Sequence, residues 1–443
     1  MTPVSSTSLG VTTTVIEIHR DGAWHPAATL QQLGSDRCRF DYLPEYAFGE
    51  TAIPLAHHLP LGIEPDRFVE GPGGEHADRR APALLYDLTP QGPGRRYLQL
   101  QLGLADHDDS ILPLVMGGAC NPIGCLRLSS AVHFASALRS GRRDSGTEQG
   151  FALDHIVDHA SAFIDHLRHD AMLAAGTTGV QGEAPKFLLS TDAHGQWFPD
   201  MALPDGLAAE HWLVKLPRGN TAADRDVLRN EAGFLRLAER CGLRMTSAPR
   251  WQEDMLFVRR FDREVVDGAL HRLPQESLAS VCDLRGFGRR PNQHLLLAGV
   301  RSVVTDPLRE TIEFLKRDVL NLAMGNLDNH PRNSAVQRLR DGTVQLTPLF
   351  DFAPMFLDPD GLVRACRWCT EDGRIQRTWT EVIDTLEVED AERQIIVQEM
   401  AAFADIVASI PLLAADCGID AAIVDKCRTD IKNQVAGLAA LYA

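Results

Sequence analysis

The sequence lacks the segments that carry a protein into or across a membrane. Among its 443 residues, no window approaches the ~18 uninterrupted apolar residues of a membrane span. The first residues, MTPVSSTSLG, contain no basic stretch followed by an apolar run, which is the pattern of a secretory signal. We therefore expect a cytoplasmic protein that does not contact membranes.

Positive charge is also scarce. The chain has 44 lysine and arginine residues against 60 aspartate and glutamate residues, which gives a formal net charge of -16. Proteins that bind the phosphate backbone of nucleic acids normally present a broad positive surface. The charge balance argues against direct DNA binding, although a local basic groove is compatible with it, because net charge averages over the whole surface.

The nine cysteines do not form a disulfide framework. Their number is odd and they are spread along the chain, which favours reduced and mostly buried thiols. Cys366 and Cys369 form a lone C-x-x-C, which is half of a zinc site or a redox pair. No second such pair exists, so a four-ligand zinc site would need His or Asp from elsewhere. Buried thiols are the simpler interpretation.

The length and composition of the chain indicate a folded protein with more than one domain. The chain exceeds the roughly 250 to 300 residues at which a single core stops growing, and 44% apolar with 23% charged residues is typical of globular proteins. The β-branched run at residues 13–19 leads to a turn at Asp21 and Gly22, which predicts a hairpin. A second strand is expected around Lys215, within HWLVKLPRG.

The later part of the chain has helical spacing. We predict helices over residues 224–241, ending at Gly242, over 306–324 and over 419–441. The pattern is mainly helical from about residue 275 onward. A β-rich front half and a helical back half indicate an α+β fold with two unequal lobes.

Three polar residues carry the chemistry. The segment GNLDNHPRNSAV (325–336) contains Asp328 and, five residues later, Asn333, and the later PLFDFAP contains Asp351. Phosphoryl transfer needs a carboxylate that orients or accepts the proton of the attacking hydroxyl, and separate oxygen ligands that hold Mg²⁺ on the phosphates. Asp328 suits the first role, and Asn333 with Asp351 suits the second. His330 is expected to support the loop.

Each of these residues has an ordinary structural explanation when it is taken alone. Asp and Asn are common turn residues and helix caps. Their combination at compatible spacing favours a function. A metal-dependent hydrolase that uses Asp328, His330 and Asp351 is an alternative, and it would turn over without ATP and bind transition metals tightly.

These segments resemble the catalytic and metal-binding segments of the HipA toxin kinases, which show an N-x-D-D-H-x-x-N pattern and a later Y-D-[LIM]-x-P pattern. Asn326, Asp328, His330 and Asn333 fall on the first pattern, and Asp351 falls on the second. Asn329 stands where the family often has Asp or Ala.

The resemblance extends over most of the chain. QGEAPK (181–186) resembles the family's phosphate-loop segment, which implies nucleotide-binding roles for Gly182 and Lys186. WLVKLP resembles the strand that carries the phosphate-binding lysine, here Lys215. The helix beginning NEAGFL resembles the one that supplies a glutamate partner, here Glu231. FVRRFDR resembles the segment that links the lobes, and it implies that Arg259, Arg260 and Phe261 lie beside adenine.

The loop before Lys186 departs from the family pattern. The position of the autophosphorylated serine of HipA kinases falls on Gly179, and two threonines precede it. This leaves Thr177 and Thr178 as the candidate autophosphorylation sites.

The resemblance implies a bilobal, protein-kinase-like fold in three parts. These are a HipA-type N-terminal subdomain (1–138), whose GCLRLSS also resembles the family, a β-rich kinase N-lobe (139–265) and an all-helical C-lobe (266–443). Its implied cofactors are ATP and Mg²⁺.

The implied activity is that of a protein serine/threonine kinase that acts as a growth-inhibiting toxin on a translation protein, such as an aminoacyl-tRNA synthetase. The implied partner is a small helix-turn-helix antitoxin (HipB-like), through which alone the chain reaches DNA. Two alternatives remain open. One is a small-molecule or lipid kinase, because specificity lies in loops. The other is a binding or co-repressor subunit.

Overall fold

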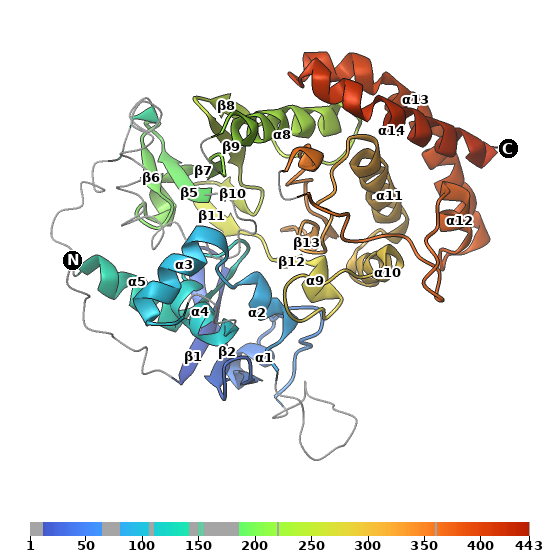
Figure 1. The fold of residues 1–443 in the computed structure, drawn as a ribbon. Coiled ribbons are helices and arrows are strands. Elements are labelled where there is room, and N and C mark those ends of the chain that lie inside the picture. The colour runs from blue at the N-terminus through green and yellow to red at the C-terminus, as the bar shows by residue number, and fades with distance from the viewer. Residues whose placement is uncertain are drawn as a thin grey trace. The chain divides into compact units, whose positions relative to one another are not determined.

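The computed structural model describes residues 12–63, 80–105, 110–140, 150, 152–153, 186–218, 221–358 and 361–442. The chain divides into two units (Figure 1). Unit 1 comprises Met1–Lys215, Asp262–Glu276 and Asp283–Gly286, and unit 2 comprises Leu216–Phe261, Ser277–Cys282 and Phe287–Ala443. The predicted division into three parts, at 138 and 265, stays a prediction.

Unit 1 begins with an antiparallel sheet of order β3-β2-β1-β4. Asp21 and Gly22, both with positive φ (49° and 75°), form the turn between β1 and β2, which confirms the predicted hairpin. Helices α1 to α5 accompany this sheet, and Leu112 and Val115 of α4 share a buried core with Ile16 of β1. The bounds are β1 (Thr13–Arg20), β2 (Ala23–Gln32), β3 (Cys38–Tyr42), β4 (Leu126–Leu128), α1 (Pro44–Ala47), α2 (Ala83–Asp87), α3 (Gly92–Leu102), α4 (Ile111–Gly118) and α5 (Ser129–Ser140).

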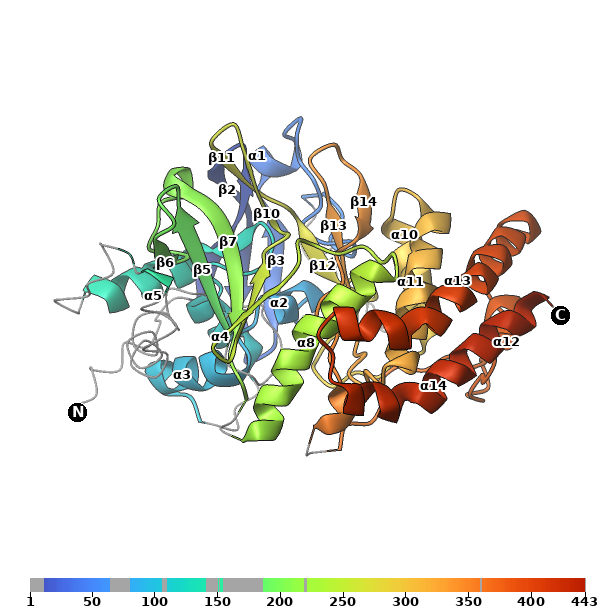
Figure 2. The same cartoon turned by 90° about the horizontal axis from the view of Figure 1, so that it is seen from above.

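The rest of unit 1 consists of two further groups of strands. Strand β5 (Lys186–Asp192) lies between β6 (Trp197–Pro199) and β7 (Ala208–Lys215), antiparallel to both (Figure 2). The strand predicted around Lys215 is therefore present as β7. The 3-10 helix η2 (Asp205–Leu207) precedes it, and β10 (Arg263–Val266) and β11 (Ala269–Arg272) form a hairpin. Strand β12 (Gln275–Ser277) lies where the chain passes to unit 2.

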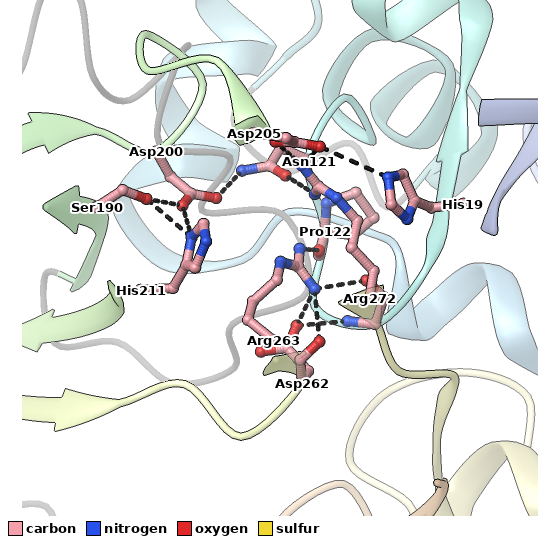
Figure 3. A network of polar contacts seen from close by, with 11 residues as sticks. His19, Asn121, Pro122, Ser190, Asp200, Asp205, His211, Asp262, Arg263 and Arg272 are labelled. Atoms are coloured by element: carbon pink, nitrogen blue, oxygen red, sulfur yellow. Dashed lines mark hydrogen bonds and ion pairs between the residues drawn. The ribbon is translucent and has the colours of Figure 1, made fainter. Parts of the chain in front are cut away.

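Buried polar side chains fill part of unit 1 (Figure 3). The Asp200 carboxylate accepts hydrogen bonds from Ser190 Oγ, from Asn121 Nδ2 at 2.6 Å and from His211 Nδ1 at 2.7 Å. The same His211 nitrogen lies 2.8 Å from Ser190 Oγ, which is fully buried. Since one nitrogen faces both the serine and the aspartate, this arrangement is not a Ser-His-Asp relay.

The network continues through Arg272 to the first strand. Arg272 donates to Asn121 Oδ1 at 2.7 Å and to both Asp205 oxygens, at 2.9 and 3.2 Å. Burial alone would raise the pKa of Asp205, but His19 and Arg272 outweigh it and hold that pKa at about 2. Because His19 lies on β1 and Ser190 on β5, this network connects the first sheet to the strands that carry Lys186 and Lys215.

Unit 2 is mainly helical. Helices α11, α13 and α14 pack against one another (Figure 1). The three predicted helices are confirmed as α8, α11 and α14; α8 starts with a capping box at Thr221 and Asp224 and ends before Gly242, which has φ 81°. The bounds are α8 (Ala222–Arg240), β8 (Arg250–Gln252), β9 (Met255–Arg259), α9 (Leu278–Val281), α10 (Gln293–Val303), α11 (Pro307–Ala323), β13 (Ala335–Arg338), β14 (Val344–Leu346), η3 (Met355–Leu357), α12 (Trp379–Asp384), α13 (Asp390–Asp416), α14 (Ala421–Ala439) and η4 (Ala440–Tyr442).

Helix α13 is long and apolar enough, by length and composition, to cross a membrane, with a mean hydropathy of 1.6 in its most apolar window. Ile396, Met400, Phe403 and Val407 are buried along one of its faces, and the helix packs against α11 and α14. Core helices of globular proteins have the same composition. The packing accounts for the buried part of this helix, which is 39% of its most apolar stretch, whereas Ile395, Ile406 and Leu412 are exposed.

The α+β fold class is confirmed, but the back half is not all-helical. Strands β13 and β14 pair antiparallel between Asp328 and Asp351 in the chain. Asp341 and Gly342, the latter with φ 89°, form their turn. An Asp-Gly pair between short alternating runs is a hairpin signal. The prediction missed it because long helical patterns lie on both sides.

Candidate active site

The loop that contains Asp328 leaves the end of α11 through a glycine. Gly325 has φ 67°, and a Cβ placed on it would lie 2.6 Å from Cδ1 of Phe356, so only glycine fits without a shift. The next residue, Asn326, is held back onto α11: its backbone N–H donates to Asn321 O and its Nδ2 to Asn321 Oδ1, both at 2.9 Å. The start of the loop is thereby fixed to a buried helix.

Asn333 and His330 shape the loop around Asp328. Asn333 Nδ2 donates to the backbone oxygen of Asp328 at 2.8 Å. The Arg332 backbone N–H donates to His330 Nδ1 at 3.2 Å, which assigns the ring proton to Nε2. That Nε2 lies 3.8 Å from Asp328 Oδ1, too far for a hydrogen bond. The Asp328 side chain is 34% exposed and so accessible to a hydroxyl from outside.

Asp351 lies between two anchored aromatic rings. The ring of Phe350 packs on Phe261, with centroids 5.9 Å apart, and Phe352, fully buried, packs on Phe234 of α8 at 5.1 Å. The backbone of Asp351 is left-handed, with φ 52°. Left-handed non-glycine residues are uncommon outside turns and cluster at functional sites. Packing on both sides thus fixes the backbone of Asp351 in a left-handed conformation, which aspartate tolerates better than most residues do.

The two segments meet in one pocket of unit 2. Asp328, Asn333, Asp351 and Asn326 line it. The Oδ1 of Asn326 is buried and has no hydrogen-bond partner among the residues that the structure describes. Carboxylate and amide oxygens are the ligands that Mg²⁺ prefers, together with water and substrate phosphates. The orphaned oxygen and the two aspartates suit that ion. The described residues contain no cluster of three or more His, Cys, Asp or Glu of the kind that binds transition metals.

The predicted adenine segment reaches the same pocket wall. Strand β9 ends at Arg259, which is exposed, while Arg260 is buried. Phe261 contacts Phe350, and Phe350 lines the pocket beside Asp351. Within unit 2, the structure therefore brings the segment that links the lobes close to the proposed metal ligand.

The two predicted phosphate-binding lysines lie together in unit 1. Lys186, the first residue of β5, is directly opposite Lys215, the last residue of β7. Both are buried, and residues directly opposite one another point to the same face of an antiparallel pair. Two ammonium groups at one place favour an anion. Glu231 is buried in α8 of unit 2. Thr177, Thr178, Gly179 and Gly182 lie outside the described residues.

The sequence analysis did not single out Asp318, which lines the pocket. Its carboxylate is buried and accepts from Gln293 Nε2 at 3.1 Å, from Trp368 Nε1 at 2.8 Å and from Arg364. A charged residue on the buried side of an amphipathic helix is the available signal, since such residues are rarely buried without partners. The partners themselves are distant in sequence and could not be predicted.

Cys366, from the lone C-x-x-C, is a structural thiol. It is fully buried, and burial raises its pKa to about 12 despite the nearby Arg364. A thiol with this pKa stays protonated, and only the thiolate is a good nucleophile or metal ligand. The arrangement gives Cys366 a packing role.

Comparisons with known proteins identify the family of the chain. The family model described as the HipA-like C-terminal domain matches residues 178–407, and the one described as the HipA N-terminal domain matches residues 21–128. The chain belongs to the HipA family. It is similar to the "Putative kinase Y4mE" of Sinorhizobium fredii, with 27% identity over 356 residues, which cover 76% of this chain and 77% of the relative.

A solved HipA structure has the same fold as this chain. The chain superposes on a Shewanella oneidensis structure of HipA with HipB and operator DNA, with a TM-score of 0.60 over 96% of each chain. The identity is 16%, so this likeness shows the fold alone. It confirms the kinase-like α+β fold of the HipA type.

Proposed function

We propose that this HipA-family chain is an ATP-dependent protein serine/threonine kinase that acts as a growth-inhibiting toxin. The observation that carries the proposal is the single pocket that collects Asp328, Asn333 and Asp351 from two separate segments. These are the groups that phosphoryl transfer to a hydroxyl requires: a proton-accepting carboxylate and separate oxygen ligands for a metal.

Asp328 is the group that meets the acceptor hydroxyl. Its carboxylate is partly exposed and its backbone is held by Asn333, so it can orient the hydroxyl and accept its proton. Asn333 and Asp351 would hold the metal, with the orphaned Asn326 Oδ1 nearby. Mg²⁺ bound by these oxygens would offset the charge that develops on the transferring phosphoryl group. His330 supports the loop through its contact with Arg332.

Nucleotide binding is assigned to the residues that match the family pattern. Lys215 and Lys186, opposite one another on β7 and β5, would stabilise phosphate charge. Glu231 is the proposed partner of Lys215, and Gly182 belongs to the phosphate loop. Arg259, Arg260 and Phe261 would lie beside adenine; Thr177 and Thr178 are the candidate autophosphorylation sites.

The proposed partners follow from the family. The substrate would be a translation protein, such as an aminoacyl-tRNA synthetase. A HipB-like helix-turn-helix antitoxin would neutralise the kinase, in keeping with the Shewanella oneidensis structure, which is a complex of HipA, HipB and operator DNA. With a net charge of -16, the chain would depend on this partner for DNA contact.

The proposal is tested by incubating the purified chain with γ-labelled ATP, Mg²⁺ and a cell lysate. We expect label on serine or threonine of protein. Asp328→Asn should abolish it, whereas Asp405→Asn, an exposed carboxylate on α13, should not change it. Label that appears only in small molecules would assign the pocket to a small-molecule kinase, and no label at all would favour a binding subunit.

A further inference from the structure

The segment Arg364–Cys369 follows the metal-binding segment in the chain and is tied directly to the catalytic loop. Asn329, the residue after Asp328, donates from Nδ2 to Cys366 O at 2.9 Å. Its Oδ1 accepts from the backbone N–H groups of Cys366, at 3.0 Å, and Ala365, at 3.1 Å. A carboxamide is suited to this contact because it offers a donor and an acceptor at once.

A second asparagine holds the other end of the same segment. Asn292, the N-cap of α10, donates from Nδ2 to Cys369 O at 2.6 Å and accepts from Cys369 N at 3.2 Å. Between the two clamps, the Gln293 N–H donates to Arg367 O at 2.9 Å. The backbone from 365 to 369 is therefore fixed from two sides.

The side chains of this segment are anchored as well. Arg364 and Trp368 both donate to the buried carboxylate of Asp318, which lines the pocket. The Trp368 ring is buried and packs edge-on against Phe314, with centroids 6.1 Å apart. Ordered activation segments of kinases often need phosphorylation to fix them. Here hydrogen bonds within unit 2 already fix the segment.

Arg367 is the one exposed side chain of residues 364–369, all of which the structure describes. Its guanidinium makes no ion pair with the residues that the structure describes. Its neighbour Cys366 is bonded to Asn329, which adjoins Asp328, so the segment holds Arg367 near the catalytic loop. A charged side chain on an immobilised backbone is preorganised, and preorganisation lowers the entropy that binding must offset.

We propose that Arg364–Cys369 is the docking segment for the acceptor protein, with Arg367 recognising an acidic side chain near the acceptor hydroxyl. Asn329 is the positioning residue that sets this segment against Asp328. This inference rests on the proposed protein-kinase function. Arginine binds carboxylates in two-pronged geometry. An exposed arginine held beside the catalytic loop would therefore attract an acidic side chain of the acceptor.

The specificity of Arg367 is tested with the full chain, γ-labelled ATP and a positional library of serine and threonine peptides, together with phosphosites mapped in lysate proteins. The wild type should prefer Asp or Glu at one position near the acceptor. Arg367→Glu should lower that preference about tenfold or reverse it. Arg340→Glu, the same charge change on an exposed arginine near the β13–β14 turn, should leave it unchanged. An unaltered preference in Arg367→Glu would overturn the assignment.

The positioning role of Asn329 is tested by separating acceptor from nucleotide kinetics. Asn329→Asp replaces the donor to Cys366 O with a carboxylate oxygen, so we expect kcat/KM for the acceptor to fall about tenfold, with ATP affinity within about twofold of wild type. Asn292→Asp, which loosens the same segment from the other end, should produce the same pattern. A parallel loss of ATP binding, or wild-type transfer, would contradict the role.

The inference and the proposed function fail in different ways. If the wild type labels no protein or peptide, the kinase proposal fails. If the wild type labels protein and the Arg367 and Asn329 variants keep its preference and its kcat/KM, only the docking segment is refuted.

Discussion

Substitutions of Asp351 should affect stability and metal binding separately, because the backbone conformation determines the first and the carboxylate determines the second. With φ 52°, an alanine should be strained, since the left-handed conformation costs an ordinary residue about 1–2 kcal/mol. Glycine avoids that strain but loses roughly 0.5–1 kcal/mol through the greater freedom of the unfolded chain. We therefore expect Asp351→Gly to be more stable than Asp351→Ala by about 0.5–1 kcal/mol. Asp351→Asn, which tolerates this conformation, should unfold close to wild type.

The assay combines urea unfolding with nucleotide binding. Stability is compared at matched slopes of the unfolding transition, and ATP affinity is measured with and without Mg²⁺. All three variants should lose the Mg²⁺-dependent part of ATP binding, because each removes the proposed charged metal ligand. The loss of Mg²⁺-dependent ATP binding would then be the same in all three variants, although their free energies of unfolding differ.

Two results would refute this reasoning. If the alanine variant is as stable as the glycine variant, the backbone of Asp351 is not left-handed in solution. If Asp351→Asn keeps full Mg²⁺-dependent binding, the carboxylate is not a metal ligand and the residue serves only the packing between Phe350 and Phe352.

Three further substitutions test the supporting structure. Gly325→Ala should cost about 2 kcal/mol in unfolding free energy and lower kcat by more than about tenfold, because a Cβ 2.6 Å from Phe356 displaces the catalytic loop; kinetics that match wild type would show that the loop adapts. Glu310→Ala should cost about 3 kcal/mol, since it removes the carboxylate that Arg244 binds at 2.6 and 2.8 Å and leaves Glu313 to offset the Arg244 charge; replacing Arg244 by Met in the same chain should recover part of the loss in urea melts. Burial lowers the pKa of His19, and the nearby Asp205 only partly offsets this effect. The unfolded chain therefore binds the proton more tightly than the folded chain does. As a result, the free energy of unfolding falls when the pH drops below 6.5, the ordinary pKa of histidine. The urea midpoint should therefore fall less between pH 7.5 and 5.5 in His19→Gln than in wild type, and equal falls would remove His19 from the acid response.

Local patterns predicted much of the fold. Helix α11 was predicted over 306–324 and spans Pro307–Ala323, because amphipathic spacing and a capping aspartate are encoded within the segment itself. The β1–β2 hairpin followed from its turn residues in the same way. The spacing of Asp328, Asn333 and Asp351 predicted that they act together, and the structure places them in one pocket.

Contacts between distant segments could not be predicted. Asp318 reaches Arg364 and Trp368 only because α11 and the later segment pack together, and no local pattern encodes that packing. The network from His19 to Ser190 is of the same kind (Figure 3). Asn329 stands where the family often has Asp or Ala, and no local pattern predicts that its amide donates to the backbone oxygen of Cys366.

The most direct test of the account compares growth on induction of the wild-type chain and of its Asp328→Asn form, with phosphoproteomics of both cultures. We expect growth arrest and a dominant new serine or threonine phosphosite only with the wild type, because Asp328 is the proposed group that meets the acceptor hydroxyl. Equal phosphosites in the two cultures, with or without arrest, would contradict it.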